Sequence, residues 1–151
     1  MKSNEAGFKF PVLGFTPDGD MWGFPDLDRL TRCGPQTLKD GLQEGMELVD
    51  ADCRRWRVAS VHRTGRAGSW VSLLWIFGPA QSRIEQELEP LPPISMDEVR
   101  ERSAKAMESS QIDYHGDDGQ AEYRSMIKSI GKARSVAKLY DLLQPDTFES
   151  Y

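Results

Sequence analysis

The side chains best suited to chemistry in this sequence are two cysteines and two histidines. Cys53 and His62 fall on one expected hairpin, where a thiol and an imidazole would resemble a nucleophile and its base. A small buried thiol and a histidine on a strand face explain both residues more simply. Cys33 and Cys53 lack the CxxC spacing of a zinc site, and no GxSxG turn occurs. We therefore expect a protein that is not an enzyme and that uses no cofactor.

An acidic loop at residues 111–119 is the best candidate for a metal site. It contains Asp113, His115, Asp117 and Asp118. A calcium loop of the EF-hand type starting at Asp113 would need glycine at position 118 and glutamate at position 124, where the chain has Asp118 and Arg124. We expect a solvated loop that begins the next helix, with no bound metal.

Charge is strongly segregated along the chain. Residues 53–83 contain six arginines and no acidic residue, although the net charge of the protein is -5. Residues 84–122 carry a net charge of -8. Charge separated in this way is either matched inside the fold or offered to a partner.

The basic segment supplies the predicted binding surface. It combines arginine with tryptophan, the two residue types most enriched at binding hot spots. The surface consists of Arg54, Arg55, Trp56, Arg57, His62, Arg63, Arg66 and Trp70. The favoured function is a protein-binding module whose partner is another protein or, as a homodimer, a second copy of the chain. The main alternative is a nucleic-acid or nucleoprotein accessory protein that uses the hairpin at 54–70, although the acidic net charge opposes the approach of a polyanion.

The first half of the chain has the pattern of an antiparallel sheet. Residues 8–15 and 20–24 flank a turn in which Pro17 and Gly19 favour a hairpin. Residues 46–50 and 55–62 form a second hairpin, with a short helix at 36–43, closed by Gly45, before it. A strand at 70–77 has apolar residues on both faces and is expected to be central. The segment at 84–88 alternates with glutamates and is expected to be an edge strand.

The second half is expected to be helical. Pro90, Pro92 and Pro93 end the sheet, and Ser95 with Glu98 forms a capping box for a helix that runs to about residue 109. A longer amphipathic helix follows at 120–143. The fold class is therefore α+β, a curled antiparallel sheet of about five strands followed by two C-terminal helices. Residues 1–90 form the sheet module and residues 91–151 the spacer and helices, which pack on the sheet as one domain. The expected core residues are Trp22, Phe24, Leu48, Val58, Val61, Leu73, Trp75 and Phe77.

Residues 45–58, preceded by Leu30, Thr31 and Leu38, resemble small uncharacterised bacterial proteins, some of them of the immunity or toxin-neutralising type. Those proteins usually have glycine where Cys53 stands. The resemblance implies a small acidic binding protein without chemistry of its own. A toxin inhibitor whose acidic segment at 85–118 mimics nucleic acid is a third candidate function. Neither end carries a targeting signal and no run is long enough to span a bilayer, so a cytoplasmic location with no membrane contact is expected.

Overall fold

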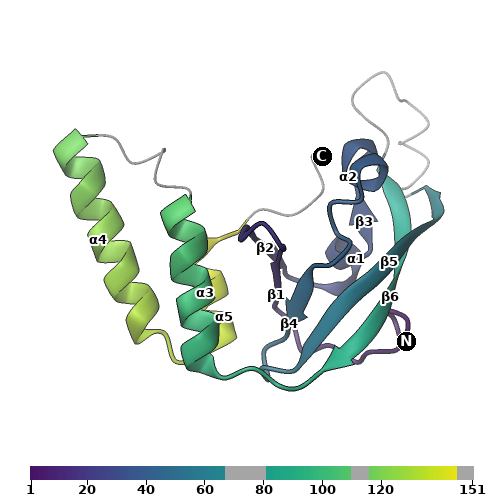
Figure 1. Ribbon diagram of the computed structural model, residues 1–151, viewed down its shortest axis with the longest axis horizontal. Coiled ribbons are helices and arrows are strands. Elements are labelled where there is room, and N and C mark those ends of the chain that lie inside the picture. Colours follow the sequence, from purple (N-terminus) through teal and green to yellow (C-terminus); the bar gives the residue numbers. More distant parts are fainter. Residues whose placement is uncertain (67–80, 110–115, 146–151) are drawn as a thin grey trace.

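The computed structural model describes residues 1–66, 81–109 and 116–145 and shows an α+β fold (Figure 1). Six strands form one curled antiparallel sheet, in the order β2-β1-β4-β5-β6-β3. The strands are β1 (Val12–Phe15), β2 (Met21–Phe24), β3 (Arg32–Cys33), β4 (Glu47–Val49), β5 (Arg55–Arg66) and β6 (Ser82–Leu91). The helices are α1 (Leu27–Leu30), α2 (Pro35–Asp40), α3 (Met96–Ser109), α4 (Gly116–Lys132) and α5 (Val136–Leu143). The predicted class and the curled antiparallel sheet are confirmed, with six strands in place of about five.

Both predicted hairpins form. Strands β1 and β2 join through a turn in which the Gly19 amide donates to the Thr16 carbonyl at 3.0 Å, and Gly19 has a φ of +94°. Strands β4 and β5 join through a turn built around Asp50, whose side chain is fully buried. Its carboxylate accepts from the backbone amides of Asp52 and Arg54, each at 3.0 Å, which fixes the turn.

The segment at 84–88 is not an edge strand, which corrects the sequence-based expectation. Strand β6 lies between β5 and β3, and a further bridge joins Lys2 to Glu87. Ile84, Gln86 and Leu88 are buried, while the alternating glutamates face outward. Glu85 pairs with the Lys2 ammonium at 3.0 Å, so the outward charges mark the solvent face of an inner strand. The strand expected at 70–77 lies outside the described residues.

The sheet is covered on both faces, and each face has its own core. The core inside the curl contains Val12, Phe24, Leu30, Cys33, Met46, Leu48, Trp56, Val58, Ile84 and Leu88. The core between the sheet and the helices contains Leu13, Phe15, Val49, Ile94, Val99, Ile130, Val136 and Leu139. Of the expected core residues, Phe24, Leu48 and Val58 are fully buried, and Trp22 and Val61 pack partly buried against the first core. Leu73, Trp75 and Phe77 lie outside the described part of the chain.

Helices α3, α4 and α5 form a second layer beside β1 and β2 (Figure 1). Helix α3 begins as predicted, because the Ser95 hydroxyl accepts from the Glu98 amide at 3.2 Å. Within the described ranges, no helix combines the length and apolarity needed to cross a bilayer. Helix α2 is shorter than expected and ends at Asp40, with Gly41 as its left-handed cap.

The long helix expected at 120–143 is divided, which is a second correction. Helix α4 ends at Lys132, and α5 begins after Ser135, whose side chain accepts from the Lys138 amide at 3.2 Å. Arg100 of α3 donates to the Ala133 carbonyl at 2.7 Å and so satisfies a carbonyl that the break leaves free. The break allows α5 to pack on β1 while α4 packs on α3 and α5.

Candidate functional site

Arg54, just before strand β5, and Arg55, its first residue, are both hydrogen-bonded within the fold. Arg54 donates from Nε and Nη2 to Asp50 Oδ2, at 2.9 and 2.7 Å, and its guanidinium lies 5.2 Å from the centroid of the Trp56 ring. Arg55 donates to Glu47 Oε2 at 3.3 Å and to the Pro92 carbonyl at 3.0 Å. These two guanidinium groups therefore hold the turn and the strand ends together.

Two further arginines of the basic segment also have acidic neighbours. Arg57 lies 3.8 Å from both Glu47 and Glu89, which is a loose pairing. Arg83 pairs with Asp28 at 2.7 Å. That hydrogen bond, followed by the hydrogen bond and charge of Arg32, outweighs the effect of burial and lowers the pKa of Asp28. Much of the segregated charge is thus matched inside the fold.

The structure separates the remaining members of the predicted surface. Trp56 is only 5% exposed and packs edge-on against Phe8, at 4.7 Å between ring centroids, so it belongs to the core. His62 and Arg63 are exposed near the far end of β5. Trp70 and the side chain of Arg66 lie outside the described residues. Trp56 therefore offers no area to a partner, whereas His62 and Arg63 are accessible.

Cys53 and His62 do not meet. Cys53 lies in the turn before β5, and His62 pairs in register with Glu85, seven residues along the strand from Arg55. Seven residues of extended chain span about 23 Å. Burial raises the pKa of the other thiol, Cys33, to about 11, so that thiol stays protonated at neutral pH. Among the described residues, no group of three histidine, cysteine or acidic side chains is placed to hold a metal.

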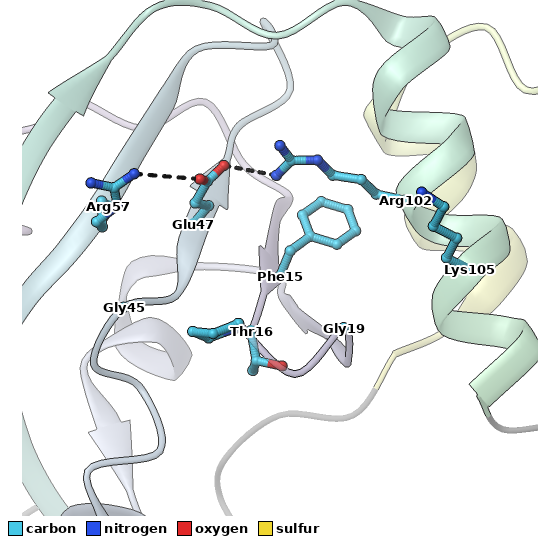
Figure 2. Close-up of a pocket in the computed structure, with 9 residues that line it drawn as sticks. Phe15, Thr16, Gly19, Gly45, Glu47, Arg57, Arg102 and Lys105 are labelled. Atoms are coloured by element: carbon cyan, nitrogen blue, oxygen red, sulfur yellow. Dashed lines mark hydrogen bonds and ion pairs between the residues drawn. The ribbon is translucent and has the colours of Figure 1, made fainter.

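A cavity of about 340 Å³ lies where the helical layer meets the sheet (Figure 2). We call it the layer groove. Its lining comes from the end of β1 and the following turn, from β4 and β5, and from α3. The lining residues are Phe15, Thr16, Pro17, Gly19, Gly45, Glu47, Arg57, Arg102 and Lys105.

Glu47 supplies the one carboxylate in the lining of the layer groove, and arginines from two elements contact it. Arg102 of α3 reaches across to it and donates to Oε2 at 2.7 Å, and Arg55 reaches the same oxygen at 3.3 Å. Burial alone would raise the pKa of the Glu47 carboxyl, but the hydrogen bond from Arg102 and the charges of Arg102, Arg55 and Arg57 together lower it. The ionised carboxylate therefore fixes α3 against the sheet.

The lining of the layer groove carries three cations and one carboxylate. Phe15 forms an apolar floor, and the Arg102 guanidinium lies 6.0 Å from the centroid of its ring. Arg57 and Lys105 stand on opposite walls, with side chains 47% and 70% exposed. The arrangement suits an acidic group that is accompanied by an apolar one.

Sequence reasoning named Arg57 as a binding residue but missed the rest of this groove, because its residues come from elements that only tertiary packing brings together. Glu47 follows no recognisable motif, and Arg102 and Lys105 read as ordinary helix-surface cations that pair with glutamates one turn away. Comparison of the chain with protein-family models, with curated proteins and with solved structures found no match in any of the three.

Proposed function

We propose that this chain is a non-enzymatic protein-binding module and that the layer groove is its binding face. The observation that carries the proposal is the cationic lining above the Phe15 floor, at the junction of the sheet and α3. Protein partners are commonly bound by an apolar anchor in a depression, with polar contacts around it. An acidic segment of a partner protein has the matching chemistry.

Arg57 and Lys105, the most exposed cations of the layer groove, can leave their present ion pairs for a partner's carboxylate with little loss of free energy. Among the described residues, Arg57 is paired by contacts of 3.8 Å, and Lys105 pairs with Glu101, whose side chain is 65% exposed. Exposed ion pairs of this kind contribute about 0–1 kcal/mol, so a partner carboxylate exchanges with them easily. The half-buried contact between Arg102 and Glu47 holds the groove in the same shape.

The nucleic-acid alternative has weaker support. Arg54, Arg55 and Arg83 have short contacts to acidic side chains of the same chain, which leaves fewer cations for phosphates. The net charge of -5 also repels a polyanion at long range. One specific form of the protein-binding proposal is that this chain is itself a toxin-neutralising protein of the immunity type, which binds its toxin in the cytoplasm.

The proposal is tested by charge reversal on the two walls of the groove. We expect the variant Arg57→Glu/Lys105→Glu to lose a partner that wild-type protein captures from a lysate of its source, identified by mass spectrometry after nuclease treatment. Arg63→Glu is the matched control, because Arg63 is an exposed cation of the same strand that does not line the groove. The purified partner should then bind the double variant at least about tenfold more weakly than the control.

A partner that binds all three proteins equally would show that the groove is not the binding face. Recovery of nucleoproteins alone, lost on nuclease treatment and weakened by Arg63→Glu, would replace the proposal with the nucleic-acid function. The salt dependence of binding is an independent test, because binding to a polyanion weakens steeply as salt rises. A steep loss would favour the nucleic-acid function.

A further inference from the structure

Strand β5 is paired on both of its edges only near its start. Strand β4 lies beside residues 55–57, and Val58 is the last residue bonded on that side. The Val58 amide donates to the Met46 carbonyl at 2.9 Å, and its carbonyl accepts from the Gly45 amide at 2.8 Å. Beyond Val58, β5 pairs with β6 alone among the described strands. We call this side of β5, over residues 59–65, the open edge.

The main chain of Val61 and Arg63 points outward from the open edge. These two residues lie opposite Gln86 and Ile84 of β6. The Gln86 carbonyl accepts from an amide of the N-terminal segment at 3.0 Å, and the Ile84 amide donates to the Thr31 carbonyl at 2.9 Å, so both turn away from β5. In an antiparallel ladder, opposite residues either bond to each other or both point away. Val61 and Arg63 therefore present two N–H donors and two carbonyl acceptors to a further strand.

Val58 shows how a strand on this side is bound. It lies opposite Leu88, whose amide donates to the Met1 carbonyl at 2.6 Å and so also turns away from β5. The groups that Val58 directs to the other side are the ones that Met46 and Gly45 bond. An added strand in line with β4 would bond Val61 and Arg63 in the same way.

The open edge begins at a wall of the layer groove. Arg57, which lines the groove, precedes Val58 in β5, and Gly45, which also lines it, bonds the Val58 carbonyl. Figure 2 shows Arg57 and Gly45 on neighbouring segments at one side of the groove. Six residues of strand span about 20 Å, so an extended segment of about six residues reaches from Arg57 to Arg63. One linear segment can therefore occupy the groove and the open edge together.

We propose that the acidic segment of the partner held in the layer groove continues along the open edge as an added strand of the sheet. This inference rests on the proposed function and specifies the form of the partner. The segment is linear: a carboxylate and an apolar side chain occupy the groove, and the adjoining residues are extended. Main-chain groups of the segment bond Val61 and Arg63, so the extended part needs strand propensity but no particular sequence.

A second copy of the chain and a nucleic acid fit the open edge less well. Residues 53–66 contain no acidic side chain, so two β5 strands placed side by side would bring arginines together without a carboxylate to pair with them. Phosphate groups supply acceptors for the two outward amides but no donor for the two outward carbonyls. An extended polypeptide supplies both, and acidic residues in it suit the cations of the adjoining groove.

A phage-displayed library of random linear twelve-residue peptides, selected on the full chain, is the probe. Wild type should enrich peptides in which acidic and apolar residues adjoin a stretch of strand-forming residues. Their binding should fall at least about tenfold in Arg63→Pro, because proline removes an outward N–H while the bonds to β6 are kept. Arg63→Ala is the matched control. It loses the same guanidinium but keeps the amide, so it should bind the peptides like wild type.

Hydrogen exchange gives a second measurement that needs no variant. In the free protein, the amides of Val61 and Arg63 should exchange at least about tenfold faster than the amide of His62, which faces β6. A selected peptide should slow exchange at Val61 and Arg63. If Arg63→Pro does not fold, as judged by circular dichroism, this protection decides the question alone.

The outcomes separate this inference from the proposed function. Peptides that are lost by Arg57→Glu/Lys105→Glu but bind Arg63→Pro as well as Arg63→Ala would overturn the inference and leave the proposed function standing. Peptides that bind the groove variant as well as wild type would contradict the layer groove as the binding face. A library that enriches no peptide, or amides of Val61 and Arg63 that are already protected in the free protein, would also overturn the inference, while the capture experiment still decides the function.

Discussion

Gly23 of strand β2 lies directly against the ring of Tyr140 of helix α5. A β-carbon added at this glycine would stand 2.8 Å from Cε2 of Tyr140 and 2.4 Å from Cγ of Pro145. Real β-carbon contacts are not this short, so any larger residue here must push α5 away from the sheet. The contact shows that the helical layer is fitted to β2 at the level of single atoms.

Gly23→Ala should therefore destabilise the protein by about 1–3 kcal/mol, the usual cost of overpacking a fitted site. Urea denaturation of wild type and of Gly23→Ala measures this difference in the free energy of unfolding. Gly131→Ala is the control: Gly131 lies inside α4 with open space around its Cα, so alanine there should stabilise the helix by about 0.5–1 kcal/mol. Equal stability of the two variants would contradict the close fit at Gly23.

Asp50→Asn should be among the more damaging substitutions in the chain. The Asp50 carboxylate is fully buried and accepts from three backbone amides and from the Arg54 guanidinium. An asparagine turns one acceptor oxygen into a donor that faces other donors and removes the charge that Arg54 pairs with. We expect a loss of about 3–5 kcal/mol. Asp52→Asn, at an exposed position of the same turn, should change stability by less than about 0.5 kcal/mol in the same denaturation experiment.

The layer groove should have a pH-dependent stability that Glu47→Gln removes. The pKa of Glu47 in the folded protein lies below its ordinary value of 4.5, so ionised Glu47 stabilises the fold at neutral pH. This stabilisation is fully present above the ordinary pKa and is lost as the pH falls through the lower, folded pKa. At pH 7 the variant should be less stable by about 1–3 kcal/mol.

The measurement is the difference in unfolding free energy between wild type and Glu47→Gln across the acid range. The difference should be constant above about pH 5 and should shrink as the pH falls further. Taking the difference cancels the contribution of Asp28, whose pKa is also lowered in the folded protein. If the difference in unfolding free energy stays constant down to pH 2, Glu47 stabilises the fold through its shape and not through its charge.

Cys53 occupies a left-handed conformation, with a φ of 59°. A residue other than glycine at such a φ costs on the order of 1–3 kcal/mol, while glycine loses about 0.5–1 kcal/mol of backbone entropy on folding. Cys53→Gly should therefore be neutral or stabilising, and Cys53→Val, which is branched at Cβ, should be destabilising. The urea midpoints of the two variants should differ in that order at an unchanged m-value. The reverse order would contradict the strain at this turn.

Local sequence signals predicted the elements that depend on local chemistry. The turn at Pro17 and Gly19, the hairpin around Asp50 and the Ser95 cap are each determined by neighbouring residues, and all three formed as expected. The division at Ser135 was missed because Ile130, Ala133, Ala137 and Tyr140 keep a helical period across it. Ser135, which could cap a new helix, and Gly131, a poor helix former, both signalled the break, but the helical period outweighed them.

The position of β6 and the layout of the sites could not be predicted in the same way. Alternating glutamates predict an exposed face, but the same pattern occurs on an edge strand and on the outer face of an inner strand. Nor does the distribution of charge along the chain say which partner an arginine will find. Arg55 meets a glutamate eight residues before it, whereas Arg102 meets the same Glu47 from 55 positions away. Only the packing of α3 on the sheet determines that contact.

The order of the strands has a consequence for how this protein behaves at high concentration. The described sheet ends on one side at β3, which has two residues, and on the other at β2, which has four and lies against Tyr140 and Pro145. Long unpaired strand edges are the templates on which chains add to one another and form fibrils. At these two ends the sheet offers little such template. The two outermost strands should therefore not start fibril growth in concentrated solutions, whereas β5 beyond Val58 pairs with β6 alone among the described strands.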